Sequence, residues 1–438
     1  MHRLRRRSAP TSAFAFALAL SLVAPALHAA TSPRGSVVPL SSPEPAWKIA
    51  PAVAPAGDGA FLVVWENLRY GIEGRFVSAA GAPRGGVLSI APNPPFPERS
   101  GTYELMARLQ PAVAALPGGG FLVAWRQDAT TTTFGPFEFV RRVHESDVWA
   151  VRLDAAGQAV AGPFRVNAET AGLQSDPVVA AHGGGVAVVW QDRVASSAAT
   201  ADVEARFFNA SVSAVGGDVR LNESPAAPEA EPALTAGAEG GFLAAWIGFE
   251  AGGTGIRARS LRDDARPRGA EAAVNARARG DQLAPTVAAG ADGGYLVAWQ
   301  DVIEPTVESR IDGRFVSRAG VPRGRDLRLG APVAEEDGAP ALASLPGGGY
   351  LLTWLGWYYD LPQWIVAQEL DAAGAAVGGP QRVSDERPRP QWAMALAAGP
   401  GGNLTAAWIA RSGTGHGIAA RILHHDSTAV ALSANRAK

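Results

Sequence analysis

The stretch Pro285-Thr-Val-Ala-Ala-Gly-Ala-Asp-Gly-Gly-Tyr-Leu-Val-Ala-Trp-Gln-Asp301 decides the fold, because close copies of it recur along the chain. Each copy contains an apolar run that a tryptophan closes, and the seven tryptophans are Trp65, Trp125, Trp190, Trp246, Trp299, Trp354 and Trp408. By subtraction, consecutive tryptophans lie 60, 65, 56, 53, 55 and 54 residues apart. A period near fifty residues is typical of propellers and related arrays. The sequence therefore predicts one repeated structural unit.

The second copy shows what that unit contains. Pro111 begins a short apolar run, glycines at 118–120 make a turn, and Phe121-Leu-Val-Ala-Trp125 forms a second run. Apolar runs bounded by glycines are typical of strands buried on both faces. Residues 148–154 and 162–167 supply a third and a fourth run. Four antiparallel strands make one propeller blade, so we predict an all-β, seven-bladed β-propeller with four strands per blade.

The strand composition fits this geometry. First strands are rich in alanine, as expected where the innermost strands converge on an axis. Second strands carry large side chains, and alternate residues of a strand point to opposite faces. We therefore expect Phe, Val and Trp to fill one layer between neighbouring blades, and Leu and Ala to fill the other.

The last copy has no clear fourth strand of its own. Residues 35–41 end ten positions before Pro51, and the fourth strands elsewhere end at the same distance before the next proline. We therefore predict that Gly35–Ser41 supplies the outer strand of the last blade and closes the ring, which removes free sheet edges. The alternative is that Val430–Asn435 fills that place.

The N-terminus has the pattern of a secretory signal peptide. Arg3, Arg5, Arg6 and Arg7 precede an apolar segment from Ala13 to Leu27, which is too short to anchor a membrane protein. We predict a signal peptide at residues 1–30, one propeller domain at residues 31–426 and a tail at residues 427–438. Cleavage is expected after Ala29 or Ala30, although Ala24-Pro-Ala26 offers a further place. The mature protein is expected to be secreted or periplasmic.

Composition excludes several classes of function. The formal net charge is −2 and the chain has no cysteine, so neither a basic nucleic-acid-binding face nor a disulfide framework is expected. No apolar run after the signal segment is long enough to span a bilayer. We expect a monomer without a cofactor, whose partner is a glycan or a protein.

Third strands carry an arginine at one register, with Gln368 as the exception. A residue repeated around a ring is typical of a structural role, and we expect these arginines to stack on a neighbouring tryptophan or to pair with the acid that follows. They are Arg75, Arg152, Arg206, Arg259, Arg314 and Arg421.

Two enlarged segments distinguish the second copy. Residues 91–110 and 126–147 are longer than their counterparts, and we expect both to be loops on one face of the propeller. Together they predict a binding wall; the alternative is a surface feature without a binding role. The polar residues that would contact a ligand are Tyr103, Arg141, Arg142 and His144.

The sixth copy contains the aromatic segment Leu355-Gly-Trp-Tyr-Tyr-Asp-Leu-Pro-Gln-Trp364. We expect a loop on the same face, where aromatic rings would stack on sugars or contact a protein. The alternative is packing within the fold, because Trp and Tyr are also ordinary core and interface residues. The proposed ligand-binding residues are Trp357, Tyr358, Tyr359, Asp360 and Trp364.

Carboxylates follow several of the repeat tryptophans, at the expected mouth of the central channel. If the protein is an enzyme, they are the candidate acids and bases of glycan chemistry, and they would also suit calcium. The alternative is that they hydrogen-bond to their own turns. The four catalytic candidates are Glu66, Asp128, Asp192 and Asp301, with Asp176 and Glu231 entering from the linkers.

No metal site is predicted from the histidines. His424 and His425 are adjacent, so on a strand they point to opposite faces. We expect them and His416 to lie at a solvent-exposed terminus.

The repeat elements Gly-Gly-[Phe/Tyr]-Leu-Val-Ala-Trp, Arg-[Phe/Leu]-Asp-x-x-Gly and Phe-x-Val-Asn resemble those of uncharacterised secreted bacterial propeller-like proteins. The resemblance covers residues 35 to about 425 and implies a fold and a compartment, but no activity or site residues. Our first hypothesis is therefore a secreted, non-enzymatic binding or scaffold propeller. The alternative is a propeller glycoside hydrolase or polysaccharide lyase, because propellers host both kinds of function.

Overall fold

The computed structural model describes residues 31–41, 47–95, 101–134, 139–193, 201–223, 229–250, 253–277, 280–303, 308–333, 339–358, 361–385, 394–412 and 415–426. The predicted signal peptide and tail lie outside these ranges. The described residues form strands and one short 3-10 helix, η1 (Pro400–Gly402). Within these ranges, no helix has the length and apolar character needed to cross a membrane.

Most repeats contribute four strands in chain order. The strands that precede the fourth repeat are β1 (Thr31–Pro39), β2 (Lys48–Pro55), β3 (Phe61–Asn67), β4 (Gly71–Val77), β5 (Pro83–Pro92), β6 (Gly101–Ala115), β7 (Phe121–Phe134), β8 (Phe139–Leu153), β9 (Phe164–Arg165), β10 (Leu173–His182), β11 (Gly185–Arg193), β12 (Ala201–Phe208) and β13 (Ala214–Arg220). The remaining strands are β14 (Glu229–Ala236), β15 (Phe242–Glu250), β16 (Gly253–Leu261), β17 (Ala272–Ala273), β18 (Asp281–Ala289), β19 (Tyr295–Ile303), β20 (Glu308–Val316), β21 (Pro322–Val333), β22 (Ala341–Ser344), β23 (Tyr350–Tyr358), β24 (Leu361–Leu370), β25 (Ala376–Arg382), β26 (Met394–Ala398), β27 (Asn403–Ser412) and β28 (Gly415–His425).

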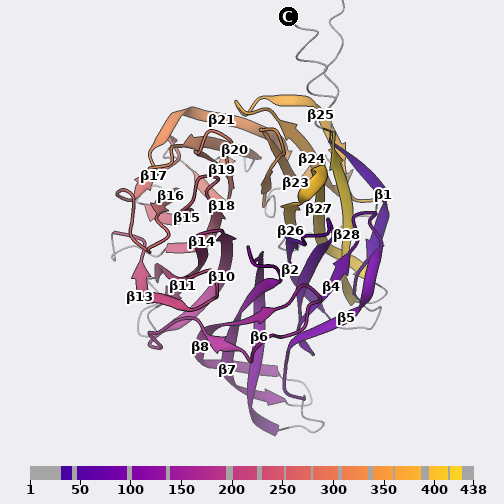
Figure 1. Cartoon of the computed structure of the whole chain (residues 1–438), viewed down its shortest axis with the longest axis vertical. Coiled ribbons are helices and arrows are strands. Elements are labelled where there is room, and N and C mark those ends of the chain that lie inside the picture. The colour runs from indigo at the N-terminus through magenta and orange to yellow at the C-terminus, as the bar shows by residue number, and fades with distance from the viewer. Residues whose placement is uncertain are drawn as a thin grey trace, which may run out of the picture.

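The sheets stand around a central axis (Figure 1). The first strands of the repeats contact one another in the cyclic order β2, β6, β10, β14, β18, β22 and β26, and β26 contacts β2 again. Strands within each repeat pair as antiparallel neighbours, moving outward from the axis. The prediction of an all-β propeller is confirmed.

The predicted number of separate blades is wrong, because backbone hydrogen bonding groups the strands into five sheets rather than seven. Three sheets have four strands and two have eight. Leu173 of β10 pairs with Ser146 of β8, and Val333 of β21 pairs with Gly356 of β23. Each of these pairings joins two consecutive repeats. The seven tryptophan repeats are therefore distributed over five blades, with two repeats in each eight-stranded sheet.

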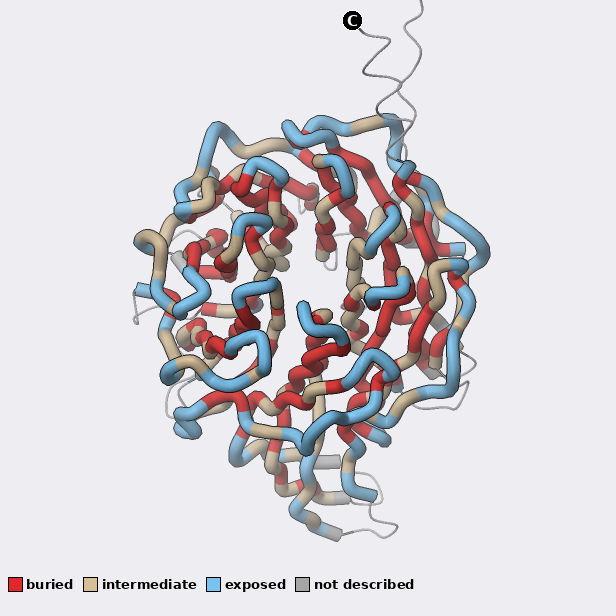
Figure 2. Tube along the Cα trace, viewed as in Figure 1, coloured by how far each residue is buried: buried red, intermediate tan, exposed pale blue. Residues whose placement is uncertain are grey.

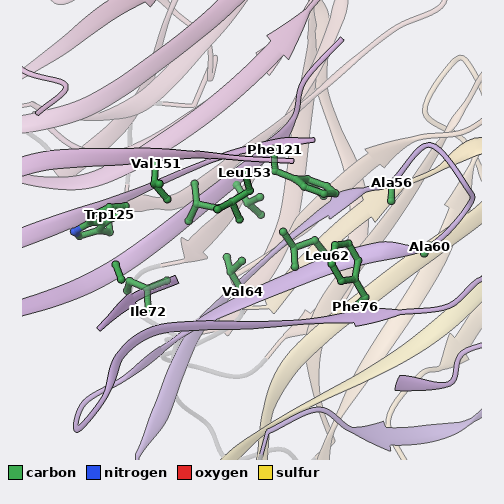
Figure 3. Packing of buried hydrophobic residues seen from close by; sticks show 14 residues of the cluster. Ala56, Ala60, Leu62, Val64, Ile72, Phe76, Phe121, Trp125, Val151 and Leu153 are labelled. Carbon is green, nitrogen blue, oxygen red and sulfur yellow. The ribbon is translucent and has the colours of Figure 1, made fainter. Parts of the chain in front are cut away.

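The apolar core lies between neighbouring repeats, in the two layers that the sequence predicts. Phe61, Val63 and Trp65 pack with residues of β27 and β28. Leu62 and Val64, which point to the other face of β3, pack with the second repeat (Figure 3). Further clusters of this kind follow around the ring. The seven repeat tryptophans are 0–3% exposed, and the buried residues form the inside of the blades (Figure 2).

The N-terminal strand completes the last sheet, as predicted. The strand order is β1-β28-β27-β26, and the backbone N–H of Leu40 donates to the carbonyl of Ile418 (2.8 Å). Ser41 Oγ accepts a hydrogen bond from the N–H of Ile418 (3.0 Å). The side chain of Asn167 accepts from Val148 N–H in the same way (2.8 Å). Ser41, which ends the predicted closing strand, therefore has the same role as Asn167, which ends the fourth run of the second copy. Val430–Asn435 lies outside the described residues.

The repeated arginines are structural, but their main partner differs from the prediction. Arg259 donates to the carbonyl of Leu221, at the end of the preceding repeat (2.8 Å). Arg206, Arg314 and Arg421 make the equivalent bond in the third, fifth and seventh repeats, each to the repeat before its own. Within the described residues, none of them stacks on a tryptophan. Each of these four arginines ties its repeat to the fourth-strand end of the preceding repeat.

Candidate functional site

The enlarged segments of the second repeat are mostly strand, which corrects the prediction of two loops. β6, β7 and β8 pair far beyond the usual strand length and project from the ring (Figure 1). The run Thr130–Thr133 lies on β7, and β-branched residues favour strands. We use the name extension for the parts of β6, β7 and β8 that project outward from Asp128, which are residues 101–107, 128–134 and 139–146.

The four ligand candidates of the second repeat lie on two different faces of the extension. Tyr103 and Arg141 both pair with Thr132, and residues directly opposite one another share a face. Arg142 pairs with Thr131, whose hydroxyl also contacts His144. The prediction that these residues form one wall is therefore wrong: Tyr103 and Arg141 share one face, while Arg142 and His144 share the other.

Asp128 lies at the base of the extension, between two guanidinium groups. Arg126 contacts both carboxylate oxygens, at 2.6 and 2.9 Å, and Arg141 donates to Oδ2 at 2.7 Å. The side chain of Asp128 is 0% exposed. A buried carboxylate with charge-assisted bonds to two arginines is fixed in place, so its observed role is to hold Arg126 and Arg141.

Glu66 lies near the same two arginines and near Asp128. It is 3% exposed, and burial raises the pKa of its carboxyl to about 7, although the Gln110 amide and the nearby arginines oppose that shift. The backbone N–H of Gln110 donates to Glu66 Oε2 (2.9 Å). A carboxyl with this pKa carries a proton for much of the time at neutral pH.

Gln110 links Glu66 to a second carboxylate on the next first strand. The side-chain nitrogen Nε2 of Gln110 donates to Asp176 Oδ1 (2.6 Å), and the side-chain oxygen Oε1 of Gln110 accepts from the backbone N–H of Asp176 (3.2 Å). Burial and the charge of Asp176 raise the pKa of Glu231, one repeat further. We call Glu66, Gln110, Asp128, Arg126, Arg141 and Asp176 the rim cluster.

A repeated bulge positions these innermost side chains. Gln110, Asp176 and Glu231 have φ of 51°, 53° and 50°, and each precedes a proline at a shift in strand register. Such a φ is uncommon outside glycine. Ala50 and Ala284 share this conformation, so the bulge belongs to the fold, and the chemistry depends on which side chain occupies it.

The other two catalytic candidates do not join the rim cluster. Asp301 contacts Arg310 (2.8 Å) and Arg277 (3.4 Å) in the fifth repeat. Asp192 accepts from Gln174 (2.8 Å), and burial followed by nearby carboxylates raises its pKa. Of the four candidate acids, the structure therefore brings together Glu66 and Asp128, while Asp192 and Asp301 lie in other repeats.

The aromatic segment of the sixth repeat is also strand rather than loop. Trp357 and Tyr358 belong to β23, Trp364 belongs to β24, and Tyr358 pairs with Leu361. The guanidinium of Arg382 lies 3.2 Å from the centre of the Trp364 ring. Packing within the blade is thus the observed role of Trp364. Tyr359 and Asp360 lie outside the described residues.

Two titratable carboxyls were not predicted from the sequence. Burial and then the neighbouring charges of Asp192, Asp218 and Asp202 raise the pKa of Glu204 to about 7. Burial and Glu271 raise the pKa of Glu229 to about 8. Except for Asp202, which shares β12 with Glu204, the acidic neighbours come from other segments of the chain, so chain position alone carried little signal for either residue.

The histidines near the C-terminus are not at an exposed end, which corrects the prediction. His416 is buried and lies 4.5 Å from the ring of Trp47. His425 is buried beside Thr31 and Glu369. Among the described residues, no three His, Cys, Asp or Glu side chains are grouped as metal ligands.

Comparison with known proteins supports the fold. No family model and no curated protein matches the chain. A protein of unknown function from Dyadobacter fermentans DSM 18053 has a TM-score of 0.54 at 10% identity, covering 91% of this chain and 100% of that one. The GH93 alpha-L-arabinofuranosidase of Fusarium graminearum gives 0.49 at 12% identity (89% and 98% covered). The alpha-L-arabinanase of Penicillium chrysogenum gives 0.44 at 12% (91% and 99%). At this identity the similarity concerns the fold alone.

Proposed function

We propose that the protein is an exported propeller that hydrolyses glycosidic bonds, with Glu66 as the general acid and Asp176 as the second carboxylate. The observation that carries this proposal is the raised pKa of Glu66, about 7, at the inner rim of the ring. A general acid must hold a proton at the working pH, and its pKa should lie near that pH. Glycoside hydrolysis needs one such acid and one partner carboxylate.

The contacts of Gln110 support this pairing. Glu66 binds the backbone of Gln110 and Asp176 binds its side chain, so one residue separates the two carboxyls and orients both. Asp176 is half-buried on a first strand, whereas Asp128 is fully buried, so Asp176 is the more accessible of the two carboxylates. We assign Asp128 a positioning role, because its arginines occupy both of its oxygens.

The extension supplies a surface for the rest of the glycan. Tyr103 shares a face with Arg141, and Arg141 binds Asp128. An aromatic ring and a guanidinium on one face suit the apolar face and hydroxyl groups of a sugar. This surface replaces the loop wall that the sequence predicts.

The test is turnover of a panel of plant and bacterial polysaccharides by the purified mature protein. Replacing Glu66 by Gln or Asp176 by Asn should lower kcat/KM by roughly a hundredfold or more. The matched control is Glu204→Gln, which removes a carboxyl of similar pKa from the third repeat, outside the rim cluster. The control should keep activity.

The pH profile gives a second readout. Because Glu66 must be protonated to donate, the rate should fall as pH rises through about 7. A Glu66→Gln variant that keeps full activity with an unchanged profile would remove Glu66 from the mechanism. A fall in rate with Glu204→Gln as large as with Glu66→Gln would mean that the loss reflects folding.

A second candidate function is glycan binding without turnover. The observation in its favour is burial: Glu66 and Asp128 are almost inaccessible, and Asp301 has two arginine partners. A glycan-array signal that survives Glu66→Gln, together with no product from any bound glycan, would favour this function. In that case, Tyr103→Ala should abolish the array signal.

A further inference from the structure

Thr31, the first residue of the closing strand β1, is held at every polar atom. Its backbone N–H donates to Glu369 Oε2 at 2.8 Å. Its hydroxyl contacts His425 Nδ1 at 3.2 Å, and its carbonyl accepts from Gln381 Nε2 at 2.8 Å. These partners come from β24, β25 and β28, so Thr31 fastens the sixth repeat to the last sheet. Such contacts are unusual for a residue next to a segment predicted to be removed.

The carboxylate that accepts from the Thr31 nitrogen, Glu369, is paired with a histidine. Glu369 is 4% exposed, and the His425 imidazole lies beside it, with Nδ1 3.6 Å from Oε1. Although burial alone would raise it, hydrogen bonds from His425 and Thr31 hold the pKa of Glu369 below its ordinary value. A buried carboxylate needs a neighbouring positive charge or several donors.

We propose that Thr31 is the first residue of the mature protein and that its α-ammonium group forms a buried ion pair with Glu369. A signal peptidase would hydrolyse the Ala30–Thr31 peptide bond: one water is consumed, Ala30 gains a carboxylate, and Thr31 gains an amine that is protonated at neutral pH. The single amide donor at the Thr31 nitrogen becomes three charged donors at the same place. Export processing therefore adds a positive charge next to the Glu369 carboxylate and strengthens the closure of the ring.

The contacts of Thr31 are the reason for placing the cleavage here. A small residue at positions −3 and −1 is usual for signal peptidase, and Ala24-Pro-Ala26 fits that pattern better than His28-Ala29-Ala30 does. Cleavage after Ala26 would leave an ordinary amide at Thr31 and a neutral donor to Glu369. Cleavage after Ala30 therefore gives a charged Thr31 nitrogen next to Glu369, whereas cleavage after Ala26 gives a neutral one.

The first experiment is the intact mass and N-terminal sequence of the protein exported from the full chain in a bacterial host. The proposal expects Thr31 as the first residue. A mature chain that begins at Leu27 or Ala30 overturns it. This outcome is independent of whether the protein cleaves or binds glycans.

The second experiment measures the ion pair directly. Two forms are released from a cleavable fusion, one beginning at Thr31 and one beginning at Ala30, and both are unfolded in urea. A charged hydrogen bond contributes about 1.5 kcal/mol or more, so the folding equilibrium constant of the Ala30 form should be about tenfold lower. In Glu369→Gln the two forms should be equally stable. Equal stability with Glu369 intact, or a difference that persists in Glu369→Gln, would refute the pair.

The pH dependence of the stability difference between the two forms distinguishes the ion pair from an effect of the one extra residue. Pairing raises the pKa of the α-amino group above its unfolded value of about 8. Its stabilisation is therefore complete below about pH 8 and is lost as pH rises through the folded value. The advantage of the Thr31 form should shrink in that range. An advantage that stays constant up to about pH 10 would come from the missing residue and not from charge.

Discussion

Glu229 should make the protein less stable as pH rises, and replacing it by Gln should remove that effect. Glu229 begins β14 and is 3% exposed. Burial is the main reason that its pKa rises to about 8, and the negative charge of Glu271 adds to it, while the Trp246 indole and Arg257 act in the opposite direction. The carboxyl is therefore stable in the fold mainly as the neutral acid.

The magnitude follows from the two pKa values. The ordinary value is 4.5 and the folded value is about 8, so between them the folded protein binds a proton that the unfolded chain has released. Stability contributed by the neutral acid is complete at low pH and declines as pH rises. Linkage gives a loss of about 2 kcal/mol at pH 6 and about 4 kcal/mol at pH 8, relative to about pH 4. Glutamine does not titrate in this range, so Glu229→Gln should not lose this stability as pH rises.

The assay is urea unfolding of the wild type and Glu229→Gln at about pH 5, 6.5 and 8. The two proteins should differ little at the lowest pH, and the variant should become more stable by a few kcal/mol at the highest. The control is Glu239→Gln, which changes an exposed carboxyl beside Arg318 and should shift stability by less than about 1 kcal/mol at every pH. A stability difference between wild type and Glu229→Gln that does not grow with pH would refute the reasoning.

Three further changes test individual contacts by urea unfolding at neutral pH. Asn167→Ala leaves the buried N–H of Val148 without its acceptor and should cost about 2 kcal/mol, whereas Asn167→Ser, which keeps an oxygen acceptor, should restore part of it. Gly120→Ala places a methyl group 2.1 Å from the Leu153 carbonyl at φ +77° and should cost about 3 kcal/mol; a neutral result would mean that the turn can rearrange. Asp128→Asn weakens the anchor of two arginines and should cost about 3 kcal/mol; a loss below about 1 kcal/mol would show that solvent reaches the site.

The core was predictable because the same pattern of apolar runs and glycine turns recurs in several copies along the chain. The glycine before the aromatic in the second and fourth copies illustrates this: an added Cβ would lie 2.1 Å from the carbonyl of Leu153 at Gly120, and 2.4 Å from the carbonyl of Leu261 at Gly241. A close approach of this kind requires glycine in these copies, whereas the first copy has Ala60 before its aromatic. The closing strand was also predictable from the repeat, because Ser41 lies ten positions before a proline, as the last residues of the fourth strands do.

Features without counterparts in the other copies were harder to predict. The segments of the second repeat were taken as loops because nothing aligned with them, yet Thr130–Thr133 and the alternating residues Tyr103–Arg108 have strand character. The merging of repeats into five blades depends on two single pairings, Leu173 with Ser146 and Val333 with Gly356. Neither pairing has a signature in composition or spacing.

The choice among the candidate acids depends on strand register. Asp301 lies opposite Arg310 on β20 and Gln282 on β18, so its own sheet neutralises it. Glu66 lies opposite Ile72 on β4 and Ile49 on β2. With apolar neighbours on both sides and its arginines only in the next repeat, its carboxyl loses water without gaining a guanidinium in its own sheet. An acid after a tryptophan is therefore a candidate proton donor where the residues opposite it are apolar, and among the four acids predicted from the sequence Glu66 meets that condition.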